Sequence, residues 1–165
     1  MNKTTQIRLA TPADIIGILA LQAANQPAQG CMISANFSRE QILQRMTDLP
    51  MIIAERDGQI TGYLMNSTRA ASHHSPILTA MLTAYSGSDN AYIFGPICVS
   101  AEERGKGIAQ QMFAKIRKLL PQREGILFIR RDNLPSLRAH EKMGMQDVAS
   151  FIFNGQAHAV FAYIG

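Results

Sequence analysis

ICVSAEERGKGIAQQMFAKI, residues Ile97–Ile116, joins an apolar run typical of a strand to a segment with helical periodicity. The connection between them is polar and charged, and it contains Gly105 and Gly107. A helix N-terminus presents backbone N–H groups without intrahelical partners, and the helix dipole adds partial positive charge there. Glycine allows positive φ and lets a ligand approach the backbone closely. The stretch therefore predicts a turn that binds phosphate, with an ordinary exposed turn as the alternative.

Two better-known phosphate motifs do not fit this stretch. A P-loop ends in Gly-Lys followed by Ser or Thr, whereas Lys106 is followed by Gly107. The dinucleotide fingerprint needs a third glycine, and Gln110 stands in its place. Arg104 and Lys106 add positive charge beside the backbone amides.

Composition bounds the class of protein. The chain has 165 residues, of which 47% are hydrophobic and 17% charged, so we expect a single globular domain over residues 1–165 rather than a disordered chain. No run of 18 apolar residues is present, which argues against a membrane span. The start MNKTTQIRLA lacks an apolar signal core, so we expect a cytoplasmic protein.

Charge and cysteine content narrow the partners. The net charge of +4 suits an anionic ligand. The basic residues lack a recognisable nucleic-acid fold signature, so we expect no nucleic-acid partner. Cys31 and Cys98 are expected to be reduced thiols, and no Cys/His cluster has metal-ligand spacing.

Periodicity and turn residues predict an alternation of strands and helices. Asp57–Gly58 and Asn154–Gly155 are favoured pairs for tight hairpin turns, and Gly95–Pro96 is expected to interrupt a strand. The order predicts a mixed α/β arrangement around one central sheet. The expected strands are 7–9, 51–56, 59–66, 91–100, 125–131 and a hairpin over 147–164; the expected helices are 12–24, one from Ser38, 77–85, 107–120 and 136–143.

Two motifs resemble one family. RGKGIA resembles the acyl-CoA signature R/Q-x-x-G-x-G/A of the GNAT superfamily of N-acetyltransferases, filled here by Arg104, Gly107 and Ala109. ICVSAEER resembles the strand that leads into that signature. NLPSLRAHEKMGM resembles the downstream motif N-x-x-A-x-x-x-Y-E-K-x-G-F, and the resemblance spans nearly the whole chain. The residues that match the downstream motif are Asn133, Glu141, Lys142 and Gly144.

The resemblance implies an α/β (α+β) fold: a single GNAT-like domain with a central, mixed, mostly antiparallel sheet of about seven strands flanked by about four helices. It implies acetyl-CoA as the acyl donor and direct transfer of the acetyl group to a primary amine of a small molecule or peptide. The implied cofactor-binding residues are Ile97, Cys98, Val99, Arg104, Gly105, Lys106, Gly107, Ile108, Ala109, Asn133 and Ser136.

The catalytic residues are where the match departs from the family. His140 stands where the family has a tyrosine that protonates the departing sulfur. A histidine can supply that proton near neutral pH, or it can merely pack beside the cofactor. The strand before the signature offers Tyr92 but no carboxylate. Tyr92 is a candidate proton relay or substrate contact, and a packed strand tyrosine is the alternative.

The acceptor side is less defined. His73, His74 and Tyr85 lie on the long segment expected to border the acceptor, and 25–33 should form another wall. The alternative function is a regulatory module that binds acyl-CoA without catalysis. A homodimer through the C-terminal hairpin is a further possibility.

Overall fold

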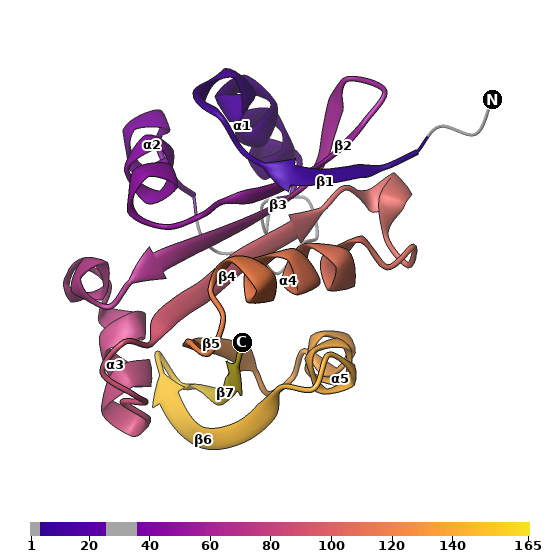
Figure 1. Ribbon diagram of the computed structural model, residues 1–165. Helices are drawn as coiled ribbons and strands as arrows, with labels where there is room; N and C mark the ends of the chain where they lie inside the picture. Colours follow the sequence, from indigo (N-terminus) through magenta and orange to yellow (C-terminus); the bar gives the residue numbers. More distant parts are fainter. Residues whose placement is uncertain (1–3, 26–35) are drawn as a thin grey trace. The chain divides into compact units, whose positions relative to one another are not determined.

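The computed structural model describes residues 4–25 and 36–165, and Figure 1 draws its elements. Within these residues, seven strands form one mixed sheet in the order β1-β2-β3-β4-β5-β7-β6, which confirms the predicted sheet. Five α-helices accompany it, one more than the family resemblance implied. Most strand pairs are antiparallel, and β4 pairs with β5 in parallel. The chain is divided into two compact units: the first is residues 1–66 and 95–119, and the second is residues 67–94 and 120–165.

The first unit begins with an antiparallel meander. Strand β1 (Gln6–Leu9) pairs with β2 (Ile52–Arg56), and β2 pairs with β3 (Gln59–Thr68). The turn between β2 and β3 has positive φ at Asp57 (57°) and Gly58 (77°). Two positive φ values define the tight turn that matches strand twist, so the predicted hairpin is confirmed.

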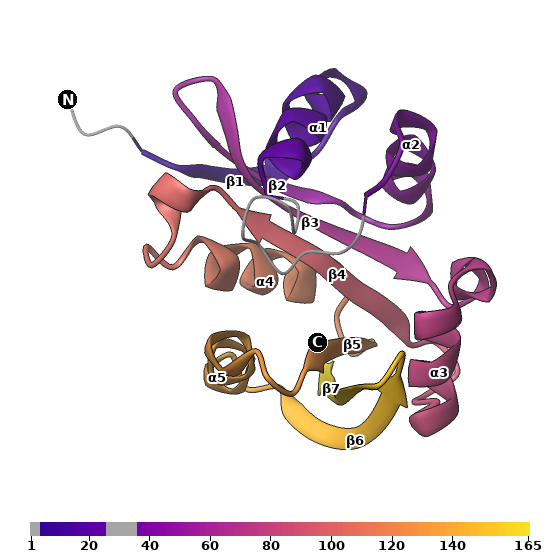
Figure 2. The same ribbon diagram turned by 180° about the vertical axis from the view of Figure 1, so that it is seen from behind.

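Three α-helices belong to the first unit. They are α1 (Ile15–Ala24), which follows the short 3₁₀ turn η1 (Pro12–Asp14), α2 (Arg39–Asp48) and α4 (Ile108–Leu119). Ser38 and Gln41 form the predicted capping box, in which each side chain bonds the backbone of the other. Figures 1 and 2 show α1 and α2 on one face of the unit's strands and α4 on the opposite face.

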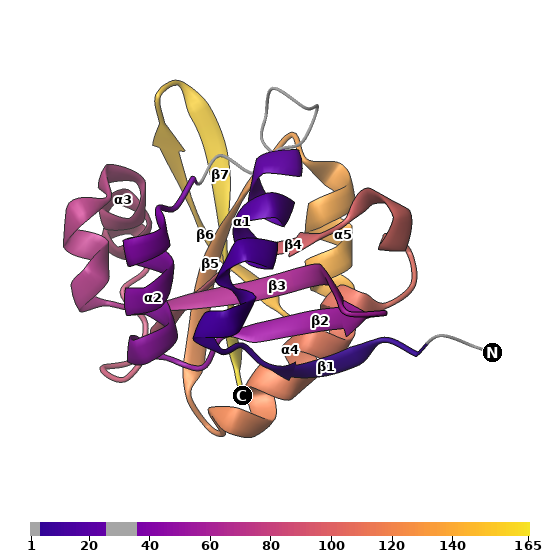
Figure 3. The same ribbon diagram turned by 90° about the horizontal axis from the view of Figure 1, so that it is seen from above.

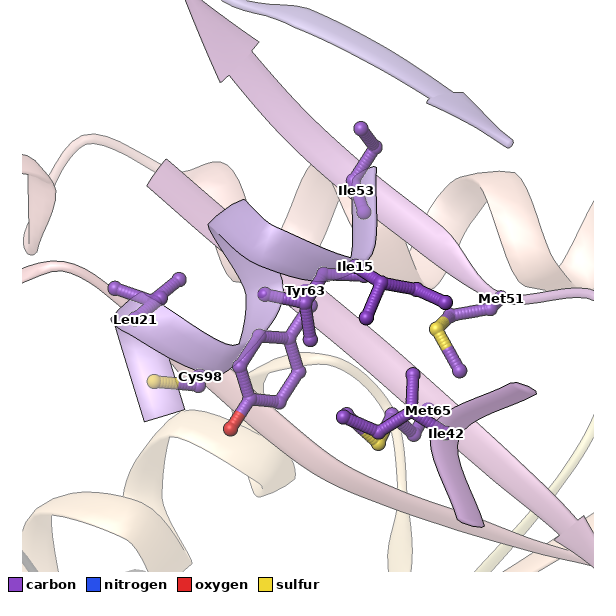
Figure 4. Close-up of a cluster of buried hydrophobic side chains, with 9 residues drawn as sticks. Ile15, Leu21, Ile42, Met51, Ile53, Tyr63, Met65 and Cys98 are labelled. Atoms are coloured by element: carbon purple, nitrogen blue, oxygen red, sulfur yellow. The ribbon is translucent and has the colours of Figure 1, made fainter. Parts of the chain in front are cut away.

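An apolar core holds the helices of this unit to its strands. Ile15 and Leu21 of α1 and Ile42 of α2 pack against Tyr63 and Met65 of β3 (Figure 4). Each such side chain contributes about 1.5–3 kcal/mol when removed from water. On the other face, α4 buries residues at helical spacing, so the helix is fixed along one stripe: Ile108, Met112, Phe113 and Ile116.

The second unit is built on three antiparallel strands. Strand β5 (Glu124–Arg130) pairs with β7 (Gln156–Ile164), which also pairs with β6 (Gln146–Phe153). Asn154 and Gly155 have φ values of 51° and 76°, which confirms the second predicted hairpin turn. The first residues of β4 (Tyr92–Val99) run parallel to β5.

Two α-helices cover this second group of strands. Figure 3 shows α3 (Pro76–Ala84) and α5 (Leu134–Lys142) on opposite faces of β5–β7. Met81 of α3 packs on Ile126 and Val160. The stretch before α3, expected to be loop, contains the 3₁₀ helix η3 (Ala70–His74). The segment that was predicted from the sequence to be mostly loop is therefore largely helical.

The sequence predicted that Gly95–Pro96 would interrupt β4, and this prediction is wrong. The strand is continuous from Tyr92 to Val99, and the irregularity is confined to Gly95, which has φ of 100° and a cis peptide bond to Pro96. Only glycine takes that φ without strain, which is why this backbone conformation falls on Gly95.

A tyrosine pair in the second unit depends on the small size of Gly125. A Cβ at Gly125 would lie 2.4 Å from the Tyr163 ring, whose hydroxyl pairs with that of Tyr92. We expect Gly125→Ala to lower the free energy of unfolding by about 1–3 kcal/mol because the ring must move. Thermal unfolding measures the change. In a Tyr163→Ser background the same substitution should be nearly neutral. Equal costs in both backgrounds would rule out this contact as the cause.

Candidate functional site

The turn between β4 and α4 has the backbone that the sequence predicted. Gly105 and Gly107 both have φ of 79°, in the left-handed region. A Cβ at Gly105 would have no atom within 4 Å, and one at Gly107 would meet only the Gln110 side chain, at 3.6 Å. The need for glycine is therefore conformational and does not come from crowding. The open space leaves room for a ligand beside the backbone.

The amides that begin α4 are free of intrahelical acceptors. The Gln111 N–H donates to the Gly107 carbonyl (3.0 Å), which is the first i to i−4 bond of the helix. The N–H groups of Ile108, Ala109 and Gln110 precede that bond and lack a carbonyl four residues back in the helix. With the positive end of the dipole of a 12-residue helix, they form an arrangement suited to phosphate.

Glu103 holds the turn from the side of β2. The carboxylate of this buried residue accepts a hydrogen bond from Arg56 (2.9 Å) and one from Lys106 (3.2 Å). The hydrogen bond from Lys106 and the charge of Arg56 hold the pKa of Glu103 below its ordinary value. Lys106, predicted as a charge for the phosphate, is thus tied to the turn itself.

Arg104 holds the turn from the side of α1. Its Nη2 donates to the Asn25 Oδ1 (2.6 Å), and its Nε donates to the Val99 carbonyl (3.2 Å). Asn25, buried at the end of α1, donates from Nδ2 to the Leu21 carbonyl (2.8 Å). The Arg104 guanidinium therefore bridges the turn and α1. Sequence reasoning missed Asn25 in this role, because nothing local links two residues 79 positions apart.

The three cofactor-binding residues predicted at the end of β4 differ in the direction of their backbone groups. The Ser100 N–H donates to the Thr61 carbonyl of β3 (2.8 Å). Backbone groups alternate between the two edges of a strand, so those of Cys98 also face β3, and those of Ile97 and Val99 face away from it. The Cys98 side chain is buried in the apolar core.

Asn133 and Ser136 start α5 in the second unit. Asn133 is the N-cap, and its Oδ1 accepts from the Ser136 N–H (3.4 Å). This use of the side chain oxygen stabilises the helix start, where an N-cap contributes typically about 1 kcal/mol. Ser136 in turn stands one helical turn before His140, on the same face.

His140 is buried, with 7% of its surface exposed, and its ring is oriented by α5. The Nδ1 atom lies 2.7 Å from the Ser136 carbonyl oxygen and 3.4 Å from its Oγ. A carbonyl only accepts, so Nδ1 carries the hydrogen and Nε2 of the neutral ring carries the lone pair. Phe94 and Phe161 meet the imidazole edge-to-face, each at 6.4 Å between ring centres.

This environment changes the proton affinity of the ring. Burial disfavours the imidazolium and lowers the pKa of His140, and the hydrogen bond to the Ser136 carbonyl opposes that effect only in part. The protonated fraction at neutral pH is therefore smaller than the unperturbed value, on which the expected acid role relied. The acid role itself stays a prediction.

Tyr92 is fully buried, and its hydroxyl pairs with that of Tyr163. The Arg123 guanidinium lies over its ring, 5.4 Å from the centre. This environment favours a packing role for Tyr92 over a role as a proton relay.

The residues expected to border the acceptor lie in different environments. The Tyr85 hydroxyl donates to Glu124 (2.7 Å), and this bond to the carboxylate raises the pKa of Tyr85. His73 and His74 are exposed on η3. Of the wall expected over 25–33, Asn25 is described above and residues 26–33 lie outside the described residues.

Membrane-spanning helices and metal centres are both absent from residues 4–25 and 36–165. None of their helices has the length and apolar character needed to cross a membrane. In the same ranges, no group of three or more His, Cys, Asp or Glu side chains is arranged to hold a metal ion.

Comparison with protein families decides the assignment. The sequence model of the acetyltransferase (GNAT) family matches residues 20–145, which is most of the chain. The chain belongs to the GNAT family of acetyltransferases. The match begins within α1 and includes the β4–α4 turn and the whole of α5. A search of curated protein sequences found no match.

Solved structures of GNAT proteins share the fold. A ribosomal-protein-alanine N-acetyltransferase from Brucella melitensis is 20% identical, with 96% of this chain and 99% of that chain covered and a TM-score of 0.71. A GNAT acetyltransferase from Streptococcus agalactiae is 18% identical (99% and 99% covered, TM-score 0.72). NAA60 of Arabidopsis thaliana, solved in complex with acetyl-CoA, is 17% identical (98% and 98% covered, TM-score 0.69). At these identities the likeness establishes the fold.

The Arg104–Asn25 bridge leads to a test of how the GNAT turn is held. We expect Asn25→Ala to weaken CoA binding about tenfold, because the unfixed turn loses its geometry and the loss of one charge-assisted bond corresponds to roughly 1.5 kcal/mol. Isothermal titration calorimetry measures the affinity. Arg104→Ala and the double variant complete a cycle, and we expect the two effects to be strongly non-additive. Additive losses would show that Arg104 acts apart from Asn25.

The buried histidines predict a dependence of stability on pH. Burial is the main cause that lowers the pKa values of both His140 and His158. Below about pH 6.5 the unfolded chain therefore binds more protons than the folded chain, and the free energy of unfolding falls as the pH falls. The slope is at most about 1.4 kcal/mol per pH unit for each proton.

Urea unfolding at a series of pH values between 7.5 and 5.5 measures this slope. The double variant His140→Gln, His158→Gln should be nearly insensitive to pH in that window, and each single variant should lie between it and the wild type. A wild-type stability that stays constant or rises towards pH 5.5 would contradict the assigned environments.

Proposed function

We propose that this protein is an acetyl-CoA-dependent N-acetyltransferase that transfers an acetyl group directly to a primary amine of a small molecule or peptide. The observation that carries the proposal is the β4–α4 turn of a GNAT chain: two glycines at φ of 79°, followed by helix amides that precede the first intrahelical bond. That backbone suits a pyrophosphate, which CoA contains.

The first unit contributes the grip on the donor. The amides of 105–109 hold the pyrophosphate, with Glu103 and Asn25 keeping the turn in place through Lys106 and Arg104. The predicted amide of Arg104 is left out of this role, because its N–H donates to the Ala101 carbonyl (3.5 Å). The backbone groups of Ile97 and Val99, which face away from β3, bond the pantetheine arm. We leave Cys98 out of this role, because the alternation set by the Ser100–Thr61 bond turns its backbone towards β3.

The second unit contributes Asn133, Ser136 and His140. By the family resemblance, Asn133 contacts the donor from the end of β5, and Ser136 assists. Acetyl-CoA supplies a thioester, which an amine attacks with release of the CoA thiol. His140 is the side chain that handles the proton, and its ring is held in one orientation by Ser136 and by two aromatic neighbours. Tyr92 is assigned a packing role.

The acceptor is proposed only as a primary amine. The Brucella protein is named for acetylation of an alanine of a ribosomal protein, and the Arabidopsis protein has also been solved with a bisubstrate analogue. Both support an acceptor site in proteins of this fold. The cytoplasmic location and the homodimer stay predictions.

A non-catalytic module that binds acyl-CoA is the second candidate. It is favoured by two features: His140 replaces the family tyrosine and is nearly buried, and β4 carries no carboxylate that could act as a base. Such a module would bind CoA through the same turn and release no thiol.

Binding and turnover separate these functions. We expect saturating acetyl-CoA to stabilise the folded chain by about 2.7 kcal/mol at 100 times its Kd, measured as a rise in Tm. A panel of small amines and peptides then reports release of CoA thiol. Stabilisation without thiol release from any acceptor would favour the binding module, and absence of stabilisation would contradict both candidates.

The matched pair Gly107→Ala and Gly155→Ala tests the turn. Both glycines have positive φ and no backbone within 4 Å of an added Cβ, but Gly155 lies in the β6–β7 turn. Each substitution should cost about 1 kcal/mol of stability, the usual cost of a left-handed residue with a Cβ. Only Gly107→Ala should weaken acetyl-CoA binding, by tenfold or more. Equal affinities of the two variants would argue against the turn as the pyrophosphate site.

A further inference from the structure

Strand β6 is an edge of the sheet, and among the described strands it pairs only with β7. The Arg131 N–H donates to the Ala157 carbonyl (2.9 Å), so the backbone groups of Ala157 face β5. Backbone groups alternate along a strand, and Ile152 is the register partner of Ala157. The N–H and C=O groups of Ile152 therefore face away from β7, and so do those of Ser150. These groups form the open edge of β6.

The open edge lacks the features that usually keep sheet edges from pairing with other chains. Natural edge strands are very short, or they carry charges or proline. The other edge strand, β1, has four residues and includes Arg8, which pairs with Asp14 and Glu55. Strand β6 has eight residues, and no charged residue or proline follows Asp147 in it. Its bulge lies between Asp147 and Ala149, before the open edge. The second half of β6 is therefore unprotected.

The surface beside the open edge is uncharged. The Ile152 side chain points into solvent, and 75% of the residue is exposed. Residues 148–165 contain no Asp, Glu, Lys or Arg, and neither do residues 70–88, in a chain that is 17% charged. The second of these ranges contains α3, which lies beside β6 and shares an apolar cluster with it (Figures 1 and 3). Helix α3 and the second half of β6 therefore form one uncharged surface.

The polar side chains on the exposed side of α3 are already hydrogen-bonded. Thr79 and Thr83 are exposed, and their hydroxyls donate to the carbonyls of Ser75 (3.1 Å) and Thr79 (2.8 Å), one turn earlier in the chain. Pro76 and Ala84, the other exposed residues of the helix, have apolar side chains. Removing this surface from water therefore leaves no side-chain donor of α3 without an acceptor.

We propose that the open edge of β6 binds the same edge of a second copy of this chain, in antiparallel register about a two-fold axis at Phe151. Ser150 of each copy then faces Ile152 of the other, and each such pair exchanges both backbone hydrogen bonds. Phe151 lies opposite its own counterpart, which is a favourable aromatic cross-strand pair. The predicted homodimer thereby gains a defined surface. The inference is independent of acetyl transfer, because none of the residues assigned to acetyl-CoA lies in α3 or β6.

The absence of charge is what favours a second copy as the partner. A two-fold axis places each surface against itself, so a charged surface would repel its counterpart. The net charge of +4 opposes self-association of the chain in general. Helix α3 and the second half of β6 contribute nothing to that repulsion. The axis is perpendicular to the joined sheet, so the two α3 helices lie on the same face of it.

A charge placed at the open edge tests the surface. Ile152→Lys puts two like charges close together across the axis, and we expect it to weaken the dimer about 100-fold or more. The matched control is Ile16→Lys, because Ile16 is 74% exposed but lies on α1 of the first unit. We expect this control to remain a dimer. Sedimentation velocity over a range of concentrations measures the mass, and circular dichroism checks that each variant is folded.

A proline tests the backbone hydrogen bonds separately. Ile152→Pro removes an N–H that faces outward, and it leaves the bonds to β7 in place because those come from Phe151 and Phe153. We expect this variant to weaken the dimer about tenfold or more. Ile152→Val keeps both the N–H and an apolar side chain, so it should associate as the wild type does.

Hydrogen exchange tests the register in the unmodified protein. The amides of Phe151 and Phe153 bond to β7, so they should exchange slowly at every protein concentration. The amides of Ser150 and Ile152 should exchange slowly only at concentrations where the dimer forms. This alternation along one strand is specific to pairing through the open edge.

The contradicting outcomes are distinct from those for acetyl transfer. A wild type that stays monomeric at every concentration would overturn the proposal, whether its outer amides exchange freely or are protected by another segment or by an added peptide strand. A dimer that survives both Ile152→Lys and Ile152→Pro, or that Ile16→Lys dissociates, would place the interface elsewhere and would also overturn it. Neither result bears on acetyl transfer, which CoA binding and thiol release report.

Discussion

The left-handed backbone at Gly105 and Gly107 is the constraint on which the candidate site depends. It ends β4, turns the chain, and leaves the first amides of α4 free of carbonyl partners. Such a turn has few contacts of its own, so the surrounding residues must hold it. Two side-chain bridges do so, one from Glu103 and one from Arg104 to Asn25. Arg104 and Lys106 therefore hold the turn in place and also give it positive charge.

Features set by local backbone chemistry were predictable from the sequence. The hairpins at Asp57–Gly58 and Asn154–Gly155 and the cap of α2 at Ser38 follow from residues that stabilise one turn geometry by themselves. The β4–α4 turn belongs to this class, and together with the downstream motif it was enough to indicate the family. In each case the physical cause lies within a few residues of the signal.

Features set by contacts between distant residues were not predictable. The Arg104–Asn25 bond joins residues 79 positions apart, and the Tyr92–Tyr163 pair joins residues 71 positions apart. The sequence could name His140, but its tautomer comes from a hydrogen bond and its proton affinity from burial by Phe94 and Phe161. Likewise the direction of the Cys98 backbone groups towards β3 follows from the pairing of Ser100 with β3.

The central claim is that backbone amides at the start of α4 bind the pyrophosphate of acetyl-CoA. Backbone ¹H–¹⁵N chemical shifts of the labelled protein, recorded as acetyl-CoA is added, test it directly. The account predicts that the amides of residues 105–109 show the largest shifts and that inorganic pyrophosphate shifts the same signals. Saturable binding of acetyl-CoA that leaves these five amides unmoved would contradict it.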